Sequence, residues 1–149
     1  METRIEEPFR NQMQEDWLCQ AAETTLAYEG VDYPAELSLF VTDDKTVQEL
    51  NRTYRGIDRR TDVLAFAFRE DTGDALFPAP PGETTHLGEV IISYHQAARQ
   101  AEEQKHLLKQ ELMILTIHGV LHLLGYDHDH SKKEQKMRAR EAEILARLD

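Results

Sequence analysis

The chain of 149 residues has the size of one domain with a core large enough to fold without help. Its net charge of −11 argues against loose electrostatic binding to nucleic acid, and its single cysteine excludes a disulfide framework or a multi-cysteine zinc site. The first ten residues are charged, and no apolar run approaches the ~20 residues that cross a bilayer. We therefore expect a cytoplasmic protein with one domain over residues 1–149.

Hydrophobic periodicity predicts an alternation of helices and strands along this chain. Apolar residues at helical spacing predict helices, and alternating or β-branched runs predict strands. Thr42 or Asp43 can cap the second helix and Ser131 can cap the last, while three of the five prolines mark a long loop. In chain order we expect helix 9–29, strand 36–41, helix 43–54, strand 63–68, loop 70–85, strand 90–93, helix 94–105, helix 107–124 and helix 132–148.

This order of elements indicates an α+β fold, in which about five helices pack on a single small mixed β-sheet. The helix expected over 107–124 is the most apolar segment of the chain and leaves almost no polar face. Such a helix belongs in the interior of a domain. Any side chains on it that carry chemistry would therefore lie in a largely buried setting.

The segment HGVLHLLGYDH, at the end of that helix, has the spacing of metal ligands. His118 and His122 lie one helical turn apart on the same face. Gly125 can end the helix in a left-handed conformation, and the chain can then return His128 to the same point. Three imidazoles that leave a fourth position open are typical of a catalytic zinc site. We predict one zinc ion per chain on these three histidines, with His130 as the alternative third ligand.

A simpler interpretation exists for each histidine alone, because a histidine in an apolar helix is usually a hydrogen-bonded core residue. Two histidines four residues apart, followed by a glycine and a third histidine at this spacing, rarely coincide by chance. The metal site is therefore the favoured interpretation. His86, His95 and His106 lie outside any ligand spacing, and we interpret them as polar residues of the surface or of helices.

The residue after the first histidine distinguishes this segment from a zinc peptidase. Peptidases with the HExxH pattern have a glutamate there, which accepts a proton from the zinc-bound water. Here the position is Gly119, which has no side chain that could do so. We therefore expect no protease activity. Phosphodiester hydrolysis is more tolerant, since zinc alone lowers the pKa of its water towards ~7 and a nearby cation can stabilise the developing charge.

Three segments together resemble the bacterial YbeY-type endoribonucleases, also called ribosomal RNA maturation factors. HGVLHLLGYDH resembles the family signature, LNRTYRGIDRRTDVLAF at 50–66 its second block and LGEVIIS at 87–93 its third. The resemblance implies a zinc-dependent endoribonuclease that cleaves single-stranded RNA, matures the 3′ end of 16S ribosomal RNA and takes part in ribosome quality control. It also implies ribosomal RNA, small-subunit proteins and a ribosome-associated GTPase as partners.

The same resemblance assigns importance to the arginine of the YR pair, Arg55. An arginine at the end of a helix can bind a phosphate with two hydrogen bonds, although most single arginines are solvated surface residues. Arg59 could help to hold RNA. The sequence departs from the family pattern at Ala65, where serine is usual, at Glu89, where aspartate is usual, and in IDRRTD, where proline often precedes the threonine.

The last expected helix alternates basic residues with Glu134, Glu141 and Glu143. We interpret it first as a salt-bridged helix face and second as an RNA contact.

Two other functions fit the histidine-rich helix: a non-catalytic ribosome assembly factor with structural zinc, and a metallohydrolase of another substrate. For the nuclease, either water or the RNA 2′-hydroxyl could be the nucleophile.

Overall fold

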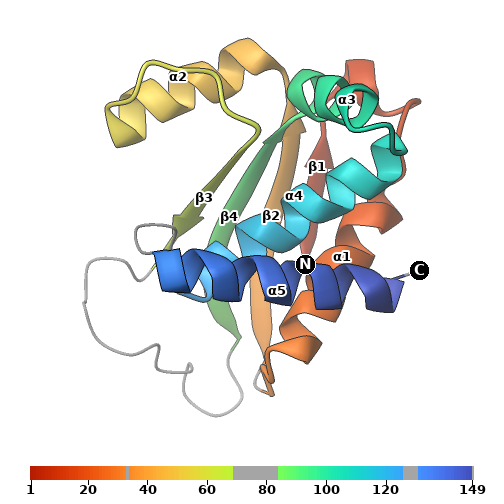
Figure 1. Ribbon diagram of the computed structural model, residues 1–149. Helices are drawn as coiled ribbons and strands as arrows, with labels where there is room; N and C mark the ends of the chain where they lie inside the picture. The colour runs from red at the N-terminus through yellow and green to blue at the C-terminus, as the bar shows by residue number, and fades with distance from the viewer. Residues whose placement is uncertain (33, 69–83, 126–130, 149) are drawn as a thin grey trace.

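The computed structural model describes residues 1–32, 34–68, 84–125 and 131–148 of the chain (Figure 1). Within these ranges the chain forms one four-stranded mixed sheet and five α-helices, which confirms the predicted α+β fold. In chain order the elements are β1 (Glu2–Ile5), the 3₁₀ helix η1 (Glu7–Phe9), α1 (Glu15–Tyr28), β2 (Ala35–Thr42), α2 (Asp44–Arg55), β3 (Val63–Ala67), β4 (Thr85–Ser93), α3 (Tyr94–Glu103), α4 (Leu108–Leu123) and α5 (Ser131–Leu148).

The sheet has the strand order β1-β2-β4-β3, so the strand that comes last in the sequence lies inside it. β1 and β4 both run parallel to β2, whereas β3 is antiparallel to β4. The register aligns Leu39 of β2 with Val90 of β4, and Val90 with Ala65 of β3. Leu39 and Val90 belong to the main hydrophobic core, which they share with apolar residues of α4, and the partly buried Ala65 packs against it.

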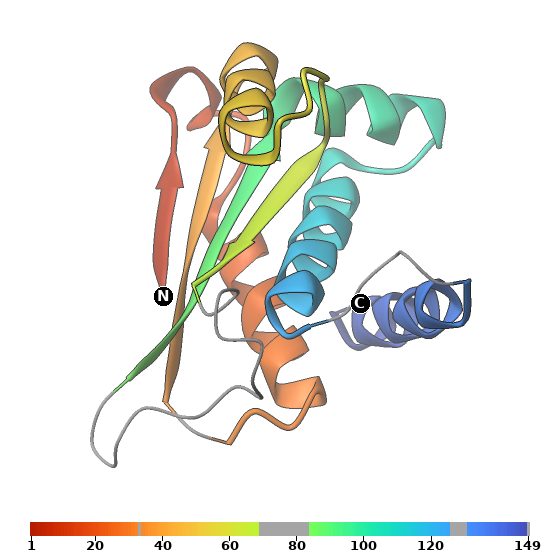
Figure 2. The ribbon, with the colours of Figure 1, turned by 90° about the vertical axis from the view of Figure 1, so that its left-hand side faces the viewer.

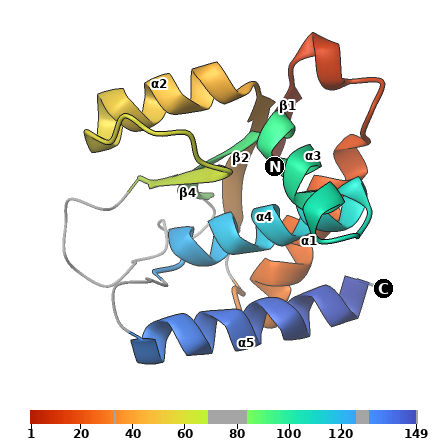
Figure 3. The same ribbon diagram turned by 45° about the horizontal axis from the view of Figure 1, so that its top comes forward.

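Helices cover both faces of this sheet. α2 lies on one face, α1 and α4 lie on the other, and α5 forms an outer layer against α1 and α4 (Figure 3). The side view of Figure 2 shows that α2 crosses only one end of the strands. α4 thus packs on the sheet on one side and on α5 on the other, which confirms the prediction that it is an interior helix. The core between α4 and α5 includes Met113, Ile117, Met137 and Ile144.

Two differences from the expected elements occur near the N-terminus. Strand β1 was not expected, because it has four residues and only Ile5 is buried, so no alternation marks it. The first long helix begins at Glu15 rather than near Phe9. Phe9 and Met13 are buried four residues apart and so imitate helical spacing, but η1 ends at Phe9 and Gln14 is extended.

The other elements differ from the expectation mainly in their ends. β4 begins at Thr85, five residues before the strand predicted over 90–93, because its first half pairs with β2 and so has a long-range partner. The last two residues of the loop predicted over 70–85 are described, and one of them already belongs to β4. The rest of that loop lies outside the described residues.

The N-terminal end of α2 follows the predicted capping, and a glycine ends the helix. The side chain of Asp43 accepts a hydrogen bond of 2.7 Å from the backbone N–H of Thr46, so Asp43 rather than Thr42 is the cap. This hydrogen bond holds the pKa of Asp43 below its ordinary value of 3.8. At the other end Gly56 adopts a left-handed conformation with φ of 69°, which ends the helix directly after Arg55.

Candidate metal centre and arginine surface

The two histidines of α4 face each other. Nε2 of His118 and Nε2 of His122 lie 3.2 Å apart, and the ring centroids are 4.7 Å apart with the rings inclined by 67°. Both side chains are half-buried, on a helix that is otherwise almost wholly buried. The helix therefore brings two nitrogen atoms to one point, as the spacing of four residues predicts.

The other ring nitrogen of His118 has a carboxylate partner. Nδ1 of His118 lies 2.6 Å from Oε1 of Glu141, which comes from α5. Both side chains are largely buried, with exposed fractions of 23% for His118 and 20% for Glu141. Donation from Nδ1–H to the carboxylate leaves the lone pair of the ring on Nε2, the atom that faces His122.

This arrangement fits a zinc ion. Two imidazole nitrogens at the usual zinc distance and a tetrahedral angle lie about 3.3 Å apart, close to the separation of the two Nε2 atoms. Among the residues that the structure describes, no group of three potential ligands is assembled. His128 and its alternative His130 lie outside the described residues. Gly125, with φ of 103°, ends the segment after α4 as predicted.

The structure also explains the glycine between the histidines. A Cβ atom on Gly119 would lie 2.5 Å from Cγ1 and 3.0 Å from Cγ2 of Val90, so α4 and β4 are in close contact at this point. The short, branched side chain of Val90 cannot swing aside. A glutamate at position 119 would collide with the sheet. The position that carries the catalytic carboxylate in a zinc peptidase serves helix–sheet packing here.

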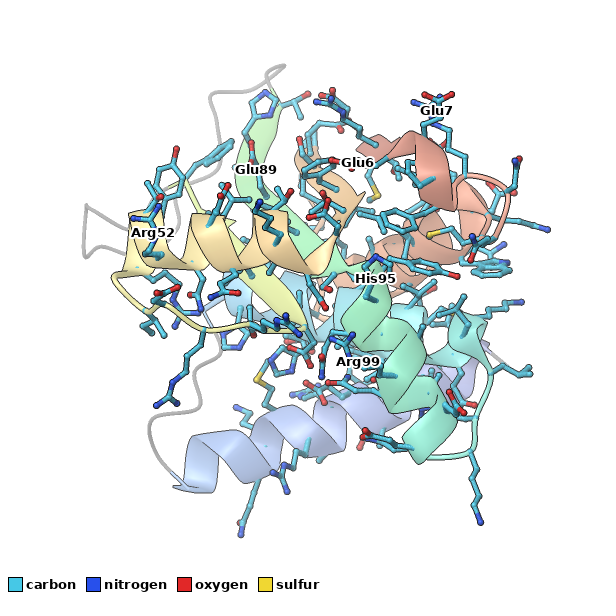
Figure 4. All side chains as sticks on the ribbon, turned by 90° about the horizontal axis from the view of Figure 1, so that it is seen from above. Glu6, Glu7, Arg52, Glu89, His95 and Arg99 are labelled. Carbon is cyan, nitrogen blue, oxygen red and sulfur yellow. The ribbon has the colours of Figure 1, made fainter. Side chains whose placement is uncertain are left out.

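The predicted arginine site lies on a different part of the molecule. Arg55 is the last residue of α2 and is exposed, on the face of the sheet opposite α4. Among the described residues, no hydrogen bond or ion pair joins Arg55 to His118 or His122. Figure 4 shows Arg52 on the same end of α2. The structure thus brings two predicted ligands together but not the arginine with them.

The segment after α2 is fixed by a buried side chain. Nδ2 of Asn51, which is 3% exposed, donates a hydrogen bond of 3.1 Å to the backbone carbonyl of Arg59. The side chain of Arg59 is itself exposed. Tyr54 is 69% exposed and makes an edge-to-face contact with Phe66 of β3. This end of α2 therefore presents arginine side chains and one aromatic ring on a backbone that is held in place.

The opposite end of α2 is tied to α3. Asp44 accepts hydrogen bonds from the hydroxyl of Ser93 and from the guanidinium of Arg99. Burial by itself would raise the pKa of Asp44, but these two hydrogen bonds lower it below its ordinary value. Figure 4 shows Arg99 on α3, directed between the two helices. α2 is thereby held at its first turn, while its last turn lies free of such contacts among the described residues.

Two predictions from the sequence need correction. Glu141 was interpreted as part of a salt-bridged surface, whereas its main partner is His118. A signal existed: Met137, Glu141 and Ile144 follow helical spacing, so a carboxylate stands in an apolar stripe. His106 was interpreted as a polar surface or helix residue, but it is half-buried and bonds the buried Glu111 at 2.6 Å.

A single mixed sheet, a buried helix with paired histidines and a carboxylate behind one of them define a small α+β protein with a candidate hydrolytic metal centre. The family model described as Endoribonuclease YbeY matches residues 1–149. The chain belongs to this family of RNA-cleaving hydrolases. The resemblance that the three sequence segments carry is therefore confirmed.

Relatives with this description are identical to the chain at about half of the aligned residues. Endoribonuclease YbeY of Moorella thermoacetica is 49% identical over 129 residues, which cover 87% of this chain and 83% of the relative. Endoribonuclease YbeY of a Roseiflexus species is 47% identical over 130 residues, with coverage of 87% and 80%. The solution structure of TM1509 from Thermotoga maritima is similar with a TM-score of 0.61 and 25% identity, covering 97% of this chain and 87% of that one.

A helix that crosses a bilayer needs about 20 mostly apolar residues. None of the helices in the described part of the chain is long and apolar enough to do so.

Proposed function

We propose that this chain is a zinc-dependent endoribonuclease that cleaves single-stranded RNA and acts in 3′-end maturation of 16S ribosomal RNA and in ribosome quality control. The observation that carries the proposal is the facing pair of Nε2 atoms on His118 and His122, 3.2 Å apart. Membership of the endoribonuclease family supplies the reaction class. The proposed ligands are these two histidines and His128.

The chemistry of the donors favours zinc over a hard cation. Imidazole nitrogen suits zinc and related transition metals, whereas magnesium and calcium take oxygen ligands. Zinc held by three imidazoles supplies a Lewis acid and lowers the pKa of water towards ~7. The role of the protein in this chemistry is to keep the Nε2 lone pairs of His118 and His122 directed at one point. Either a water molecule or the RNA 2′-hydroxyl serves as nucleophile under this proposal.

The end of α2 supports an RNA contact. Arg55 offers a planar guanidinium that can take a phosphate with two hydrogen bonds, and Arg59 offers a second cation nearby in sequence. The exposed ring of Tyr54 is suited to stacking on a base. α2 and α4 contact the edge strand β3 from opposite faces of the sheet. We propose that an RNA strand passes around this edge, with Arg55 binding its backbone.

The proposed partners come from membership of the family, and the charge of the chain bears on how it binds them. A chain with a net charge of −11 binds bulk RNA weakly and in a salt-sensitive manner. Under this proposal, specificity comes from the ribosomal context: ribosomal RNA, proteins of the small subunit and a ribosome-associated GTPase. The site of action is then the cytoplasm, where ribosomes mature.

Cleavage of a single-stranded RNA by rigorously purified protein tests the proposal. Wild type should cleave, His118→Ala should not, and His86→Ala should behave as wild type, since His86 is an exposed histidine of β4 far from α4 in sequence. Zinc content is measured on the same samples. Zinc binding without cleavage by wild type would favour the non-catalytic assembly factor. Hydrolysis of a small ester or amide, but not of RNA, would favour a different metallohydrolase.

A further inference from the structure

Helix α5 carries a carboxylate in the middle of its buried stripe. Met137 and Ile144 are fully buried against α1 and α4, and Glu141 lies between them at helical spacing. Its side chain is only 20% exposed. Burial of a carboxylate carries a desolvation penalty that a paired donor offsets, and here the donor is the imidazole of His118.

The contact of Glu141 with His118 connects α5 to the histidine pair of α4. Oε1 of Glu141 lies 2.6 Å from Nδ1 of His118, a short contact of the kind that a charged acceptor makes. Glu141 thus bonds the nitrogen on the far side of the ring from His122. A carboxylate on Nδ1 fixes the tautomer with the proton on Nδ1 and the lone pair on Nε2. The same hydrogen bond also restricts rotation of the imidazole ring about the Cβ–Cγ bond.

Contacts between α5 and the end of α1 hold the segment that carries Glu141 in place. Arg140 forms an ion pair of 3.6 Å with Glu29 at the end of α1. The guanidinium groups of Arg140 and Arg147 both lie over the ring of Tyr28, at 5.3 and 4.6 Å from its centroid. These contacts join α5 to α1 next to the residue that bonds His118. The carboxylate therefore stands on a helix held by its neighbours on both sides.

We propose that Glu141 is a positioning residue for the metal centre, which orients His118 and holds its Nε2 lone pair toward the metal. The inference rests on the proposed zinc site and extends it to a residue of α5. Partners of this kind, placed behind a ligating histidine, change metal affinity by about 10- to 100-fold when they are removed. Glu141 does not touch the RNA in this proposal; it acts through His118.

A purely structural role would have a different signature. If Glu141 only linked α5 to α4, its removal would lower the melting temperature of the metal-free protein and leave zinc affinity unchanged. If it positions His118, zinc affinity should fall by more than the stability of the metal-free protein explains. The two roles are therefore separated by measuring both quantities on the same variants.

The test uses Glu141→Ala and Glu141→Gln in the full chain, with Glu143→Ala as the matched control. Glu143 is an exposed glutamate two residues further along the same helix. Zinc affinity is measured by competition with a chelator. The geometry of the ligands is followed by the visible absorption spectrum of the Co²⁺-substituted protein. The stability of the metal-free protein is measured by its melting temperature. Glu141→Ala should bind zinc about 10- to 100-fold more weakly and show an altered Co²⁺ spectrum.

Glu141→Gln should lie between Glu141→Ala and wild type, since an amide oxygen still accepts from Nδ1–H but carries no charge. Glu143→Ala should match wild type. Wild-type zinc affinity in both Glu141 variants would overturn the inference and leave the proposed zinc enzyme intact. Absence of zinc binding by wild type would instead refute the proposed metal site. If Glu141→Ala fails to fold, the isosteric Glu141→Gln decides alone, and an unchanged affinity in it refutes the inference.

Discussion

The C-terminal halves of α4 and α2 differ in the way that they hold their functional side chains. On α4, His118 and His122 face each other, and Glu141 bonds the ring of His118 from behind. On α2, Arg55 is exposed and makes no contact of this kind with the described residues. In the first region the functional side chains contact one another. The second keeps its cations solvated, which suits recognition of a polymer whose shape varies.

The largest expected effect on zinc content and on RNA cleavage is that of removing a histidine from α4. His122→Ala should reduce zinc from about one ion per chain to background, because one of the two facing nitrogens is lost. Cleavage of single-stranded RNA should fall by on the order of 1,000-fold, since a catalytic metal contributes several kcal/mol of charge stabilisation. Elemental analysis and single-turnover kinetics measure the two quantities. Zinc retained at full occupancy in this variant would remove His122 from the site.

The exposed region should affect the rate but not the stability. Arg55→Ala should lower single-turnover RNA cleavage by on the order of 100-fold, as the loss of one contact to the transition state does. Stability should change by no more than about 0.5 kcal/mol, because the side chain is exposed. Arg55→Lys should recover only part of the rate, since an ammonium lacks the planar two-point contact.

Arg52→Ala is the matched control for Arg55, since Arg52 lies one turn earlier on the same helix and is also exposed. It should leave the cleavage rate close to that of wild type. Equal rates for Arg55→Ala and Arg52→Ala would mean that the end of α2 acts only through its total charge. Arg55 would then have no specific role in cleavage beyond that of any positive charge on this end of α2.

Packing beside the histidine pair gives the next effect in size. Gly119→Ala should destabilise the protein by about 2 kcal/mol, because the added methyl group collides with Val90. The double variant with Val90→Ala should lose less than the sum of the single losses, since the smaller side chain makes room. Urea unfolding of the four proteins measures this coupling. Strictly additive losses would show that α4 does not depend on close contact with β4 here.

Gly119→Glu should be destabilised further and should gain no protease activity. The carboxylate would enter the helix–sheet contact instead of the space beside the metal ligands. Digestion of an unstructured peptide, with and without a chelator, checks this expectation. Zinc-dependent peptide cleavage by this variant, or by wild type, would contradict it.

The smallest effect concerns the cap of α2. Asp43→Ala should cost about 1 kcal/mol at neutral pH, whereas Asp43→Asn keeps an acceptor and should cost less. The pKa of Asp43 is lower in the folded state than the ordinary value of 3.8. Its contribution is therefore complete above pH 3.8 and is lost as the pH falls through the folded pKa. The stability difference between wild type and Asp43→Ala, from urea unfolding, should narrow below pH 3.8.

Local spacing was sufficient to predict the features that depend on local geometry. The turn of a helix places His118 and His122 on one face, and Asp43 caps α2 through a bond to a residue three positions away. The features that were not predicted depend on distant partners. Strand β1 exists because it pairs with residues 38–41, and Glu141 matters because α5 returns to α4. The reason for Gly119 required the packing of α4 on β4.

The strand order β1-β2-β4-β3 has a consequence for synthesis on the ribosome. β4 pairs with β2, whose partner residues lie about fifty positions earlier, and with β3 on its other side. Until β4 has emerged from the exit tunnel, the nascent chain holds two separate parts of a sheet with no shared hydrogen bonds. The core then still lacks α4, which comes later in the sequence. The enzyme therefore completes its sheet and core only after β4 and α4 have both been synthesised.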